Sequence, residues 1–593
     1  MLNRHQNLSF SQSNKERNRY TTTRPLLVIF AFLIITITFL NFIIPPFQNP
    51  DEPQHFGGIM VEAWGEENQA EVEQAIIKMM DKHQWWRLVG MGRPAKLPER
   101  LVDISFLMGY YPLQDFKQRL AGIKFYHLIL GRFFRFLRVR NINFAYYLCR
   151  LISIFLTLGG VIFLFLSLKI FKEELRQFFW LAFLFILFLP QFLISSLGVN
   201  SDALANFLGG AFFWAMALLM AGRGRREVLY PLFVGTAVLG FLVDRSTFLL
   251  VPLALVGPFF LVKKERYQES IVDILMLVII FLFLAITFVN LFPLLAENNF
   301  MWFSRVIKRF SEAGPVFFSL GKEARDFLVF IADSFLVKFG WAVFGVGAVV
   351  YYVWRVIIMV VMVGVVVYLG RAIGLMWVRG WARLKEIYGL RTRRRFRRRT
   401  VSEFGRGTFD WKKEGWQLRD IIRDKREKLG EGRRGGSESV EVGKRGIEIG
   451  QSEQMGRGAF LKFAVFSVIA IILQLLGAWS FFGTRMLAQG RHFFPLIIPI
   501  AFLFGLGIKE FVTFVAGRSI VRKASPRGMV EDMDEFGDEI IDLSGLKDRA
   551  LINPTNIVGA TLILLEFILL NYLIWAKLIP IFHLTISSPH PGV

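Results

Sequence analysis

Long apolar segments, separated by charged ones, set the pattern of this chain. Each reaches roughly the 20 residues that a helix needs to cross a hydrocarbon core of about 30 Å. The segment at 228–262 is too long for one span, and Asp244-Arg245 interrupts it, so the pattern predicts a helical hairpin there. We therefore predict an all-α, polytopic membrane protein with about eleven transmembrane helices. Two lie in the hairpin and one in each of 25–45, 143–171, 177–197, 200–221, 271–293, 340–370, 459–482, 493–516 and 556–580.

The polar segments divide the chain into four parts. The basic N-terminal segment predicts an uncleaved signal anchor with a cytoplasmic N-terminus, which places the next loop outside. Amphipathic helices are expected in the external loops, at 66–84, 113–139 and 300–310. The predicted parts are a cytoplasmic tail (1–24), a transmembrane catalytic module (25–370) with external loops at 47–142 and 294–338, a basic cytoplasmic loop (371–458) and a C-terminal transmembrane module (459–593).

The composition excludes cysteine-based sites and argues against a nucleic-acid-binding protein. The single cysteine, Cys149, lies in an apolar segment and excludes both an intrachain disulfide and a cysteine metal site. Residues 371–458 hold 24 Lys and Arg against 12 Asp and Glu, and this excess of 12 is half of the chain's net charge of +24. We interpret that segment as a disordered loop whose basic cluster at 391–399 touches anionic lipid. RNA or partner binding is the alternative for this loop, and specific nucleic-acid binding is not expected of the chain as a whole.

The first group of candidate residues follows the first apolar segment. Asp51, Glu52 and His55 lie together where a span ends and water begins. Asp51 is suited to cap a short helix, with Gln54 three residues later, so a purely structural role is one reading. Capping needs one carboxylate and does not account for Glu52 and His55. The group is therefore a candidate acid–base centre, and the same three side chains are candidate ligands of a divalent metal.

Further polar residues fall on the same predicted face. They are Asn200 and Asp202 at the start of one span, Asp244 and Arg245 at the hairpin tip, and Arg485, Arg491 and His492 before the span at 493–516. Separate explanations exist: helix capping at Asn200, a local ion pair at the tip, and arginines that reach the head groups. Carboxylates that activate a hydroxyl, together with arginines that hold a phosphate, suit group transfer from a lipid phosphate carrier.

Several of these motifs resemble a known family. Residues 50–56 (PDEPQHF) resemble the acidic motif after the first span of GT-C glycosyltransferases, such as protein O-mannosyltransferases and aminoarabinose transferases. Residues 198–204 (GVNSDAL), 339–341 (FGW) and 489–495 (QGRHFFP) are similar to a bacterial branch, the membrane proteins of domain of unknown function 2142. The resemblance covers about 25–370 and 459–516. His492 replaces the aromatic residue usual after the Gly-Arg pair, and the basic loop looks like an insertion.

The resemblance implies a GT-C bundle, a polyprenyl-phosphate sugar as donor, Asp51 or Glu52 as base and Arg491 on the donor phosphate. We accordingly expect a multi-pass plasma-membrane glycosyltransferase with its active site on the external face. The acceptor would be a hydroxyl of a glycan, a lipid or a protein. The alternatives are a transporter or flippase of lipid-linked glycans, which predicts polar residues through the middle of its spans, and a non-catalytic scaffold.

Overall fold

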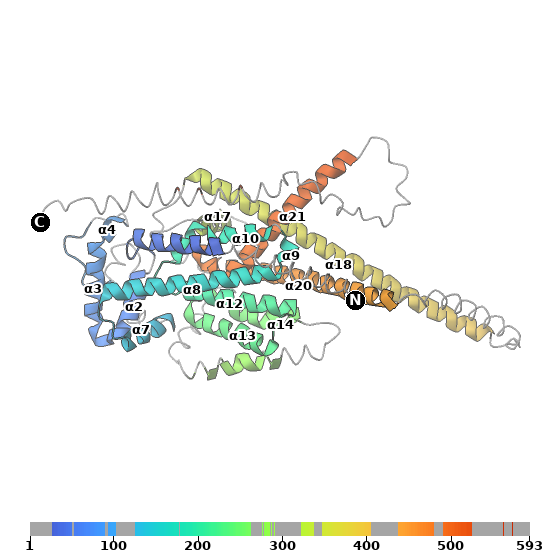
Figure 1. The fold of residues 1–593 in the computed structure, drawn as a ribbon, viewed down its shortest axis with the longest axis horizontal. Helices are drawn as coiled ribbons and strands as arrows, with labels where there is room; N and C mark the ends of the chain where they lie inside the picture. The colour runs from blue at the N-terminus through green and yellow to red at the C-terminus, as the bar shows by residue number, and fades with distance from the viewer. Residues whose placement is uncertain are drawn as a thin grey trace, which may run out of the picture. The chain divides into compact units, whose positions relative to one another are not determined.

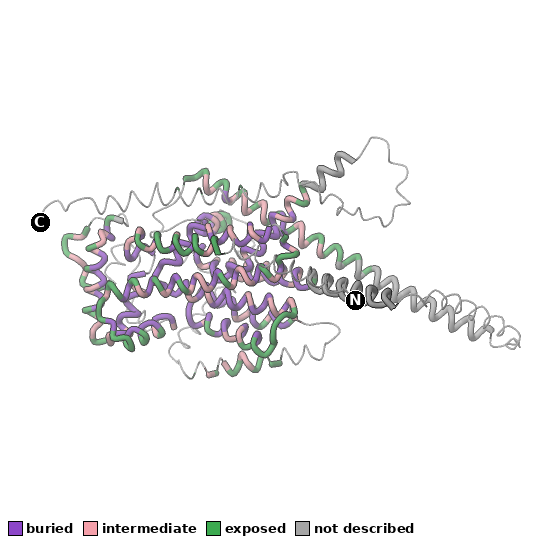
Figure 2. Tube along the Cα trace, viewed as in Figure 1, coloured by how far each residue is buried: buried purple, intermediate pink, exposed green. Residues whose placement is uncertain are grey.

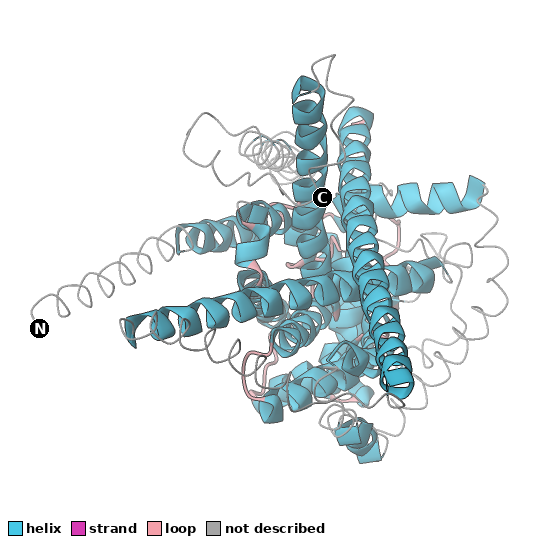
Figure 3. Ribbon diagram, turned by 90° about the vertical axis from the view of Figure 1, so that its right-hand side faces the viewer, coloured by secondary structure: helices cyan, strands magenta, loops and turns pink. Residues whose placement is uncertain are grey.

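The computed structural model describes most of the apolar segments and part of the loops between them. The described residues are 27–49, 52–88, 93–101, 125–176, 178–261, 322–336, 347–404, 437–479 and 490–524, with scattered positions at 275–290 and 561–572. Within these residues the chain forms only helices and the loops that join them (Figure 3). The predicted tail at 1–24, the predicted helix at 300–310 and most of the predicted spans at 271–293 and 556–580 lie outside them.

Six described helices are long and apolar enough to cross a membrane, which indicates a multi-pass membrane protein. They are α8 (Ile142–Ile170), α12 (Asp202–Ala221), α13 (Arg226–Val243) and the apolar stretches Ala348–Leu375, Gly458–Trp479 and Gly490–Val515. The last three belong to α18 (Ala348–Phe404), α20 (Ser437–Trp479) and the pair η4 (Gly490–Leu496) and α21 (Ile497–Ala524). Shorter apolar helices are Leu27–Ile43, α10 (Phe178–Leu187) and α14 (Leu250–Leu261).

Two apolar segments are broken in the structure, and one of the breaks was predicted. The break expected in 228–262 is confirmed, because α13 ends at Val243 and η2 (Arg245–Thr247) separates it from α14. The span predicted at 177–197 is also interrupted, which the apolar pattern did not show. α10 ends at Leu187, and the short α11 (Pro190–Ser195) begins at a proline. Proline has no amide hydrogen to continue a helix and is favoured in a first turn, so it separates the two segments.

The first loop folds into a small helical layer. It contains α2 (Glu52–Trp64), η1 (Glu66–Asn68), α3 (Gln69–Lys82), α4 (Trp85–Leu88) and α7 (Phe125–Phe136). The amphipathic helix expected at 66–84 is present as η1 and α3, and the described part of the one expected at 113–139 is α7. Buried rings of this layer, including those of Phe47, Phe56 and Trp85, share one apolar core with Tyr146 of α8. Burial of these large rings holds the loop against the end of that helix.

Helix α12 is the centre of the helical bundle. It packs between α8 and α13, and η4 lies against it (Figure 1). Its most apolar stretch is 72% buried, as is that of Gly490–Val515, against 44% for α8. Figure 2 colours the residues of the chain by burial. A Cβ at Gly209 of α12 would collide with the carbonyl of Pro495, so the missing side chain allows η4 its close approach. This contact brings the first residues of η4 towards the start of α12.

The basic segment differs from its prediction. α18 continues through Phe404 and α20 begins at Ser437, so residues 371–404 and 437–458, expected to be disordered, are helical. Arg, Lys and Glu have high helix propensity, which favours a helix beyond the apolar stretch. The structure divides into two units, and Val365–Leu461 form one of them. Residues 405–436 lie outside the described part.

Candidate functional site

Glu52 lies at the centre of a buried network. It is the first residue of α2, and its side chain is fully buried. Its Oε1 accepts hydrogen bonds from the Tyr146 hydroxyl at 2.7 Å and from the Val199 amide at 2.9 Å. Its Oε2 accepts from the Asn49 amide at 3.2 Å. One carboxylate therefore joins three segments: the end of the first apolar helix, α8 and the residues that lead into α12.

Arg150 of α8 supplies the charge opposite Glu52. Its Nε lies 3.7 Å from Glu52 Oε1, and both side chains are fully buried. The guanidinium donates to the backbone carbonyls of Asn41, Ile44 and Pro45 at 3.3, 2.8 and 2.9 Å. A buried ion pair repays its desolvation only when further hydrogen bonds satisfy its remaining donors and acceptors. These carbonyls satisfy the two terminal nitrogens of Arg150 where the first apolar helix ends, whereas Nε, which faces Glu52, makes no hydrogen bond.

A histidine pair lies on the next turn of α2. His55 Nδ1 and His127 Nε2 of α7 are 2.8 Å apart, a hydrogen bond in which one ring donates and the other accepts. At least one of these imidazoles is therefore neutral in this arrangement. Beside it, burial raises the pKa of Tyr126, so its hydroxyl, 3.4 Å from Ser153 Oγ, remains protonated. The predicted candidate His55 thus belongs to a partly buried polar contact between α2 and α7.

A second polar cluster forms where α12, α13 and η4 meet. Asp202, Asp244 and His492 each offer one ligand atom, and these atoms lie within 4.8 Å of one another. Arg491 lies beside them, with its Nε 3.7 Å from Asp202 Oδ2 and both side chains largely buried. The four residues come from three segments that are far apart in sequence, with Arg491 and His492 adjacent in one of them. An arginine and three candidate ligands of a divalent cation in one place could together bind a phosphate group.

Surrounding groups orient the members of this cluster. Asp244 accepts from Ser201 Oγ at 2.5 Å and from the Ser246 amide at 2.9 Å. Asn200 Oδ1 accepts from the Asp202 amide at 3.1 Å. The backbone carbonyl of His492 accepts from Gln474 Nε2 at 2.7 Å. Because hydrogen bonds hold each carboxylate or its backbone, the cluster is organised before any ligand binds.

Two buried amides lie between the clusters. The Nδ2 atoms of Asn49 and Asn200 have no hydrogen-bond partner in the structure, and both residues are buried. A Cβ at Gly198 would stand 2.8 Å from the first nitrogen and 3.0 Å from the second. The absence of a side chain at Gly198 therefore allows both amides to approach its backbone closely. Each Nδ2 is a buried donor that an acceptor oxygen, from water or from a substrate hydroxyl, would satisfy.

Three of the predicted site residues have side chains that the structure does not describe. Asp51 and Arg485 lie outside the described residues, and the side chain of Arg245, in η2, does too. The metal ligands considered for the first group were Asp51, Glu52 and His55. Among the described residues, the His, Asp and Glu side chains with metal-ligand spacing are instead Asp202, Asp244 and His492.

Sequence reasoning missed Arg150, Tyr146 and His127. Arg150 lies inside an otherwise apolar segment, and an ionisable residue at such a position is a functional or structural candidate by default. The sequence therefore did contain a signal that could have identified Arg150. Tyr146 and His127 carry no comparable signal, because their importance follows from the residues they contact.

Comparison of the chain with protein-family models, with curated proteins and with solved structures found no match in any of the three. The class that the structure supports is a helical protein of the multi-pass membrane type, with six long apolar helices within its described residues.

We expect Arg150→Met to destabilise the protein by about 3–5 kcal/mol, because it leaves the Glu52 carboxylate buried without its counter-charge. Glu52→Gln should have a similar effect, and the double variant should cost less than the sum of the two. The free energy of unfolding in detergent measures this. Glu99→Gln, which removes an exposed partner of Lys96, is the control and should change little. Additive costs would show that the two buried charges do not interact.

Proposed function

We propose that this protein is a membrane glycosyltransferase that moves a sugar from a polyprenyl-phosphate donor to an acceptor hydroxyl. The observation that carries the proposal is the convergence of Asp202, Asp244, His492 and Arg491 from three separate segments. The phosphate group of such a donor is recognised by positive charge. An arginine and a bound metal ion both provide positive charge. The resemblance of residues 50–56 to GT-C transferases supports the same reaction class.

Each group has a defined part in this reaction. The acceptor oxygen forms a bond to the anomeric carbon as the bond from that carbon to the phosphate oxygen breaks. Asp51 takes the proton of the acceptor hydroxyl, and polyprenyl phosphate leaves. Arg491 stabilises the charge that develops on the leaving phosphate, with Arg485 as a second candidate. Displacement in a single step inverts the anomeric centre.

The contacts of Glu52 favour Asp51 as the base. Both oxygens of Glu52 already accept hydrogen bonds, and Arg150 Nε lies 3.7 Å from Oε1. Proton transfer to such a carboxylate would disrupt the network that joins α2, α8 and Val199. We therefore assign Glu52 a positioning role, through the segment that carries Asp51.

The position of the polar residues along the helices favours an enzyme over a transporter. Glu52 and Asp202 are the first residues of α2 and α12, and Asp244 immediately follows α13. Transporter sites typically lie near the membrane midplane, at interruptions within the spans. Polar groups gathered at helix ends instead suit a site that meets substrate at one membrane surface.

Asp51→Asn should lower transfer by about 100-fold or more, the usual scale for loss of a general base. Arg491→Ala should lower it more than Arg491→Lys, because lysine retains the charge but not the two-pronged geometry. The measurement is release of polyprenyl phosphate from a panel of synthetic polyprenyl-phosphate sugars by the purified protein. Arg93→Gln, which removes an exposed arginine paired with Asp81, is the matched control. Full activity of the Asp51→Asn variant would show that Asp51 is not the catalytic base.

We place the divalent cation of this proposal at Asp202, Asp244 and His492. Their ligand atoms lie within 4.8 Å of one another, and a shared ion would draw each of them to about 2.1 Å from it. Purified protein should bind about one equivalent of Mn²⁺, measured by electron paramagnetic resonance, because a mixed carboxylate and imidazole set suits that ion. Asp244→Asn and His492→Gln should each weaken binding at least about tenfold, since each removes one of three ligands.

Asp81→Asn and His83→Gln are the controls, because they change the same residue types outside the cluster and should leave Mn²⁺ binding unchanged. Loss of binding in His55→Gln, with none in Asp244→Asn, would move the cation to the first group of candidates. Absence of Mn²⁺ binding by the unmodified protein would show that the proposed metal site is wrong. The proposed transfer reaction would still be tested separately by the transfer assay.

A further inference from the structure

A cavity of about 90 Å³ lies at the opposite end of α12 from Asp202. It is lined by the last turn of α12, the start of α13, the end of α14 and Lys462 of α20. Because α12 has 20 residues, the cavity is about 30 Å from the Asp202 cluster, at 1.5 Å per residue. It is therefore a separate site from the one described above.

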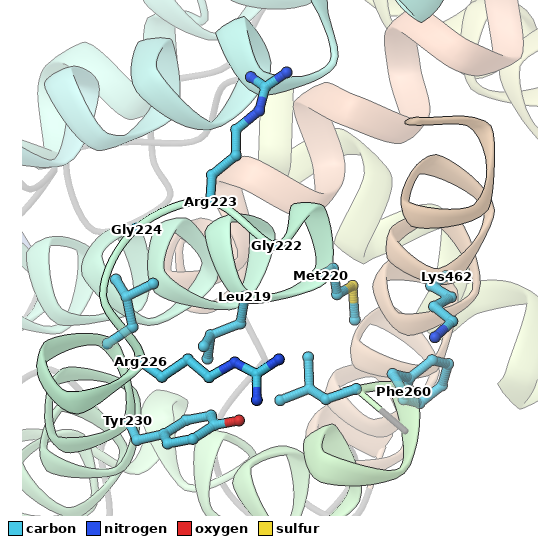
Figure 4. Close-up of a pocket in the computed structure, with 11 residues that line it drawn as sticks. Leu219, Met220, Gly222, Arg223, Gly224, Arg226, Tyr230, Phe260 and Lys462 are labelled. Carbon is cyan, nitrogen blue, oxygen red and sulfur yellow. The ribbon is translucent and has the colours of Figure 1, made fainter. Parts of the chain in front are cut away.

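The cavity has basic groups at two of its sides. Figure 4 shows the Arg226 guanidinium reaching in from α13, with the Tyr230 hydroxyl directed towards it, and Lys462 entering from α20. Arg223 also borders the cavity, but its guanidinium points away from these groups. Of the described residues that line the cavity, three are basic and none is acidic. A lining with three basic side chains and no acidic one suits an anionic ligand.

The other walls are apolar. They are formed by Leu219, Met220, Leu229, Phe260 and Leu261. The bend that shapes the cavity is made by Gly222 and Gly224, whose φ angles of 66° and 87° suit glycine. A soluble anion would gain nothing from such walls, whereas a lipid would place its acyl chain against them.

We infer that this cavity binds the phosphate of an anionic phospholipid, held by Arg226 and Lys462, with a chain against the apolar wall. The site lies where apolar helices end in a basic turn, the position at which basic pockets between transmembrane helices meet anionic head groups. Lys462 and Arg226 come from helices distant in sequence, so a bound lipid would also join α13 to α20. The inference does not depend on the proposed transfer reaction.

The test uses the full-length protein in detergent, titrated with phosphatidylglycerol and followed by native mass spectrometry. Arg226→Gln/Lys462→Gln should weaken binding of the first lipid by about tenfold or more, because both cations are lost. The matched control is Arg225→Gln/Lys169→Gln, which removes two exposed charges that do not line the cavity and should change binding less than about twofold. Arg223→Gln should resemble the control. Thermal unfolding checks that each variant is folded.

Equal weakening in the cavity variant and the matched control would overturn the site in favour of diffuse surface attraction. Unchanged binding in the cavity variant would overturn it outright. Phosphatidylcholine, which carries phosphate without net charge, should bind at least about tenfold more weakly than phosphatidylglycerol. Glycerol 3-phosphate tests whether the cavity binds a soluble phosphate ester rather than a lipid phosphate. If it displaced the lipid at micromolar concentration, the cavity would be assigned to a soluble phosphate ester.

Discussion

The buried pair of Glu52 and Arg150 is the constraint on which the first half of the structure depends. Each charge would be costly to bury alone, and each is compensated by the other and by hydrogen bonds from or to the backbone. Those backbone groups belong to the end of the first apolar helix and to Val199. The pair therefore fixes the start of α2 and the end of the first apolar helix relative to α8 and the start of α12. The Asp202 cluster begins three residues after Val199 and inherits that position.

Much of the fold, and part of the site, could be predicted from the sequence. Apolar runs gave the helices, and Asp244 gave the hairpin break, because a charged pair is too costly within a span. Asn200, Asp202, Asp244 and His492 were recognisable as polar residues at predicted helix ends. Their convergence was not, since it depends on close backbone contact at Gly209, which carries no signal of its own. The helical continuation beyond residue 370 was also missed, because charge suggested disorder where helix propensity prevailed.

The two ends of α12 differ in chemistry. One end carries carboxylates, an arginine and a histidine that are held by neighbouring side chains and suit the recognition of a phosphate together with a metal ion. The other ends at Gly222 in a basic turn around an apolar cavity. This difference matches a protein whose reaction occurs at one membrane surface and whose opposite surface contacts anionic lipid. A single central helix thus positions both regions, and the contact of η4 with α12 completes the first of them.

Sided labelling tests this arrangement most directly. After Cys149→Ala, single cysteines are placed at exposed positions near each end: Lys96→Cys and Leu137→Cys on the loop side, Glu173→Cys and Arg225→Cys on the basic side. A membrane-impermeant maleimide added to intact cells should label the first two, and it should label the last two only after permeabilisation. Labelling of Arg225→Cys in intact cells together with protection of Lys96→Cys would place the proposed active site in the cytoplasm and contradict the account.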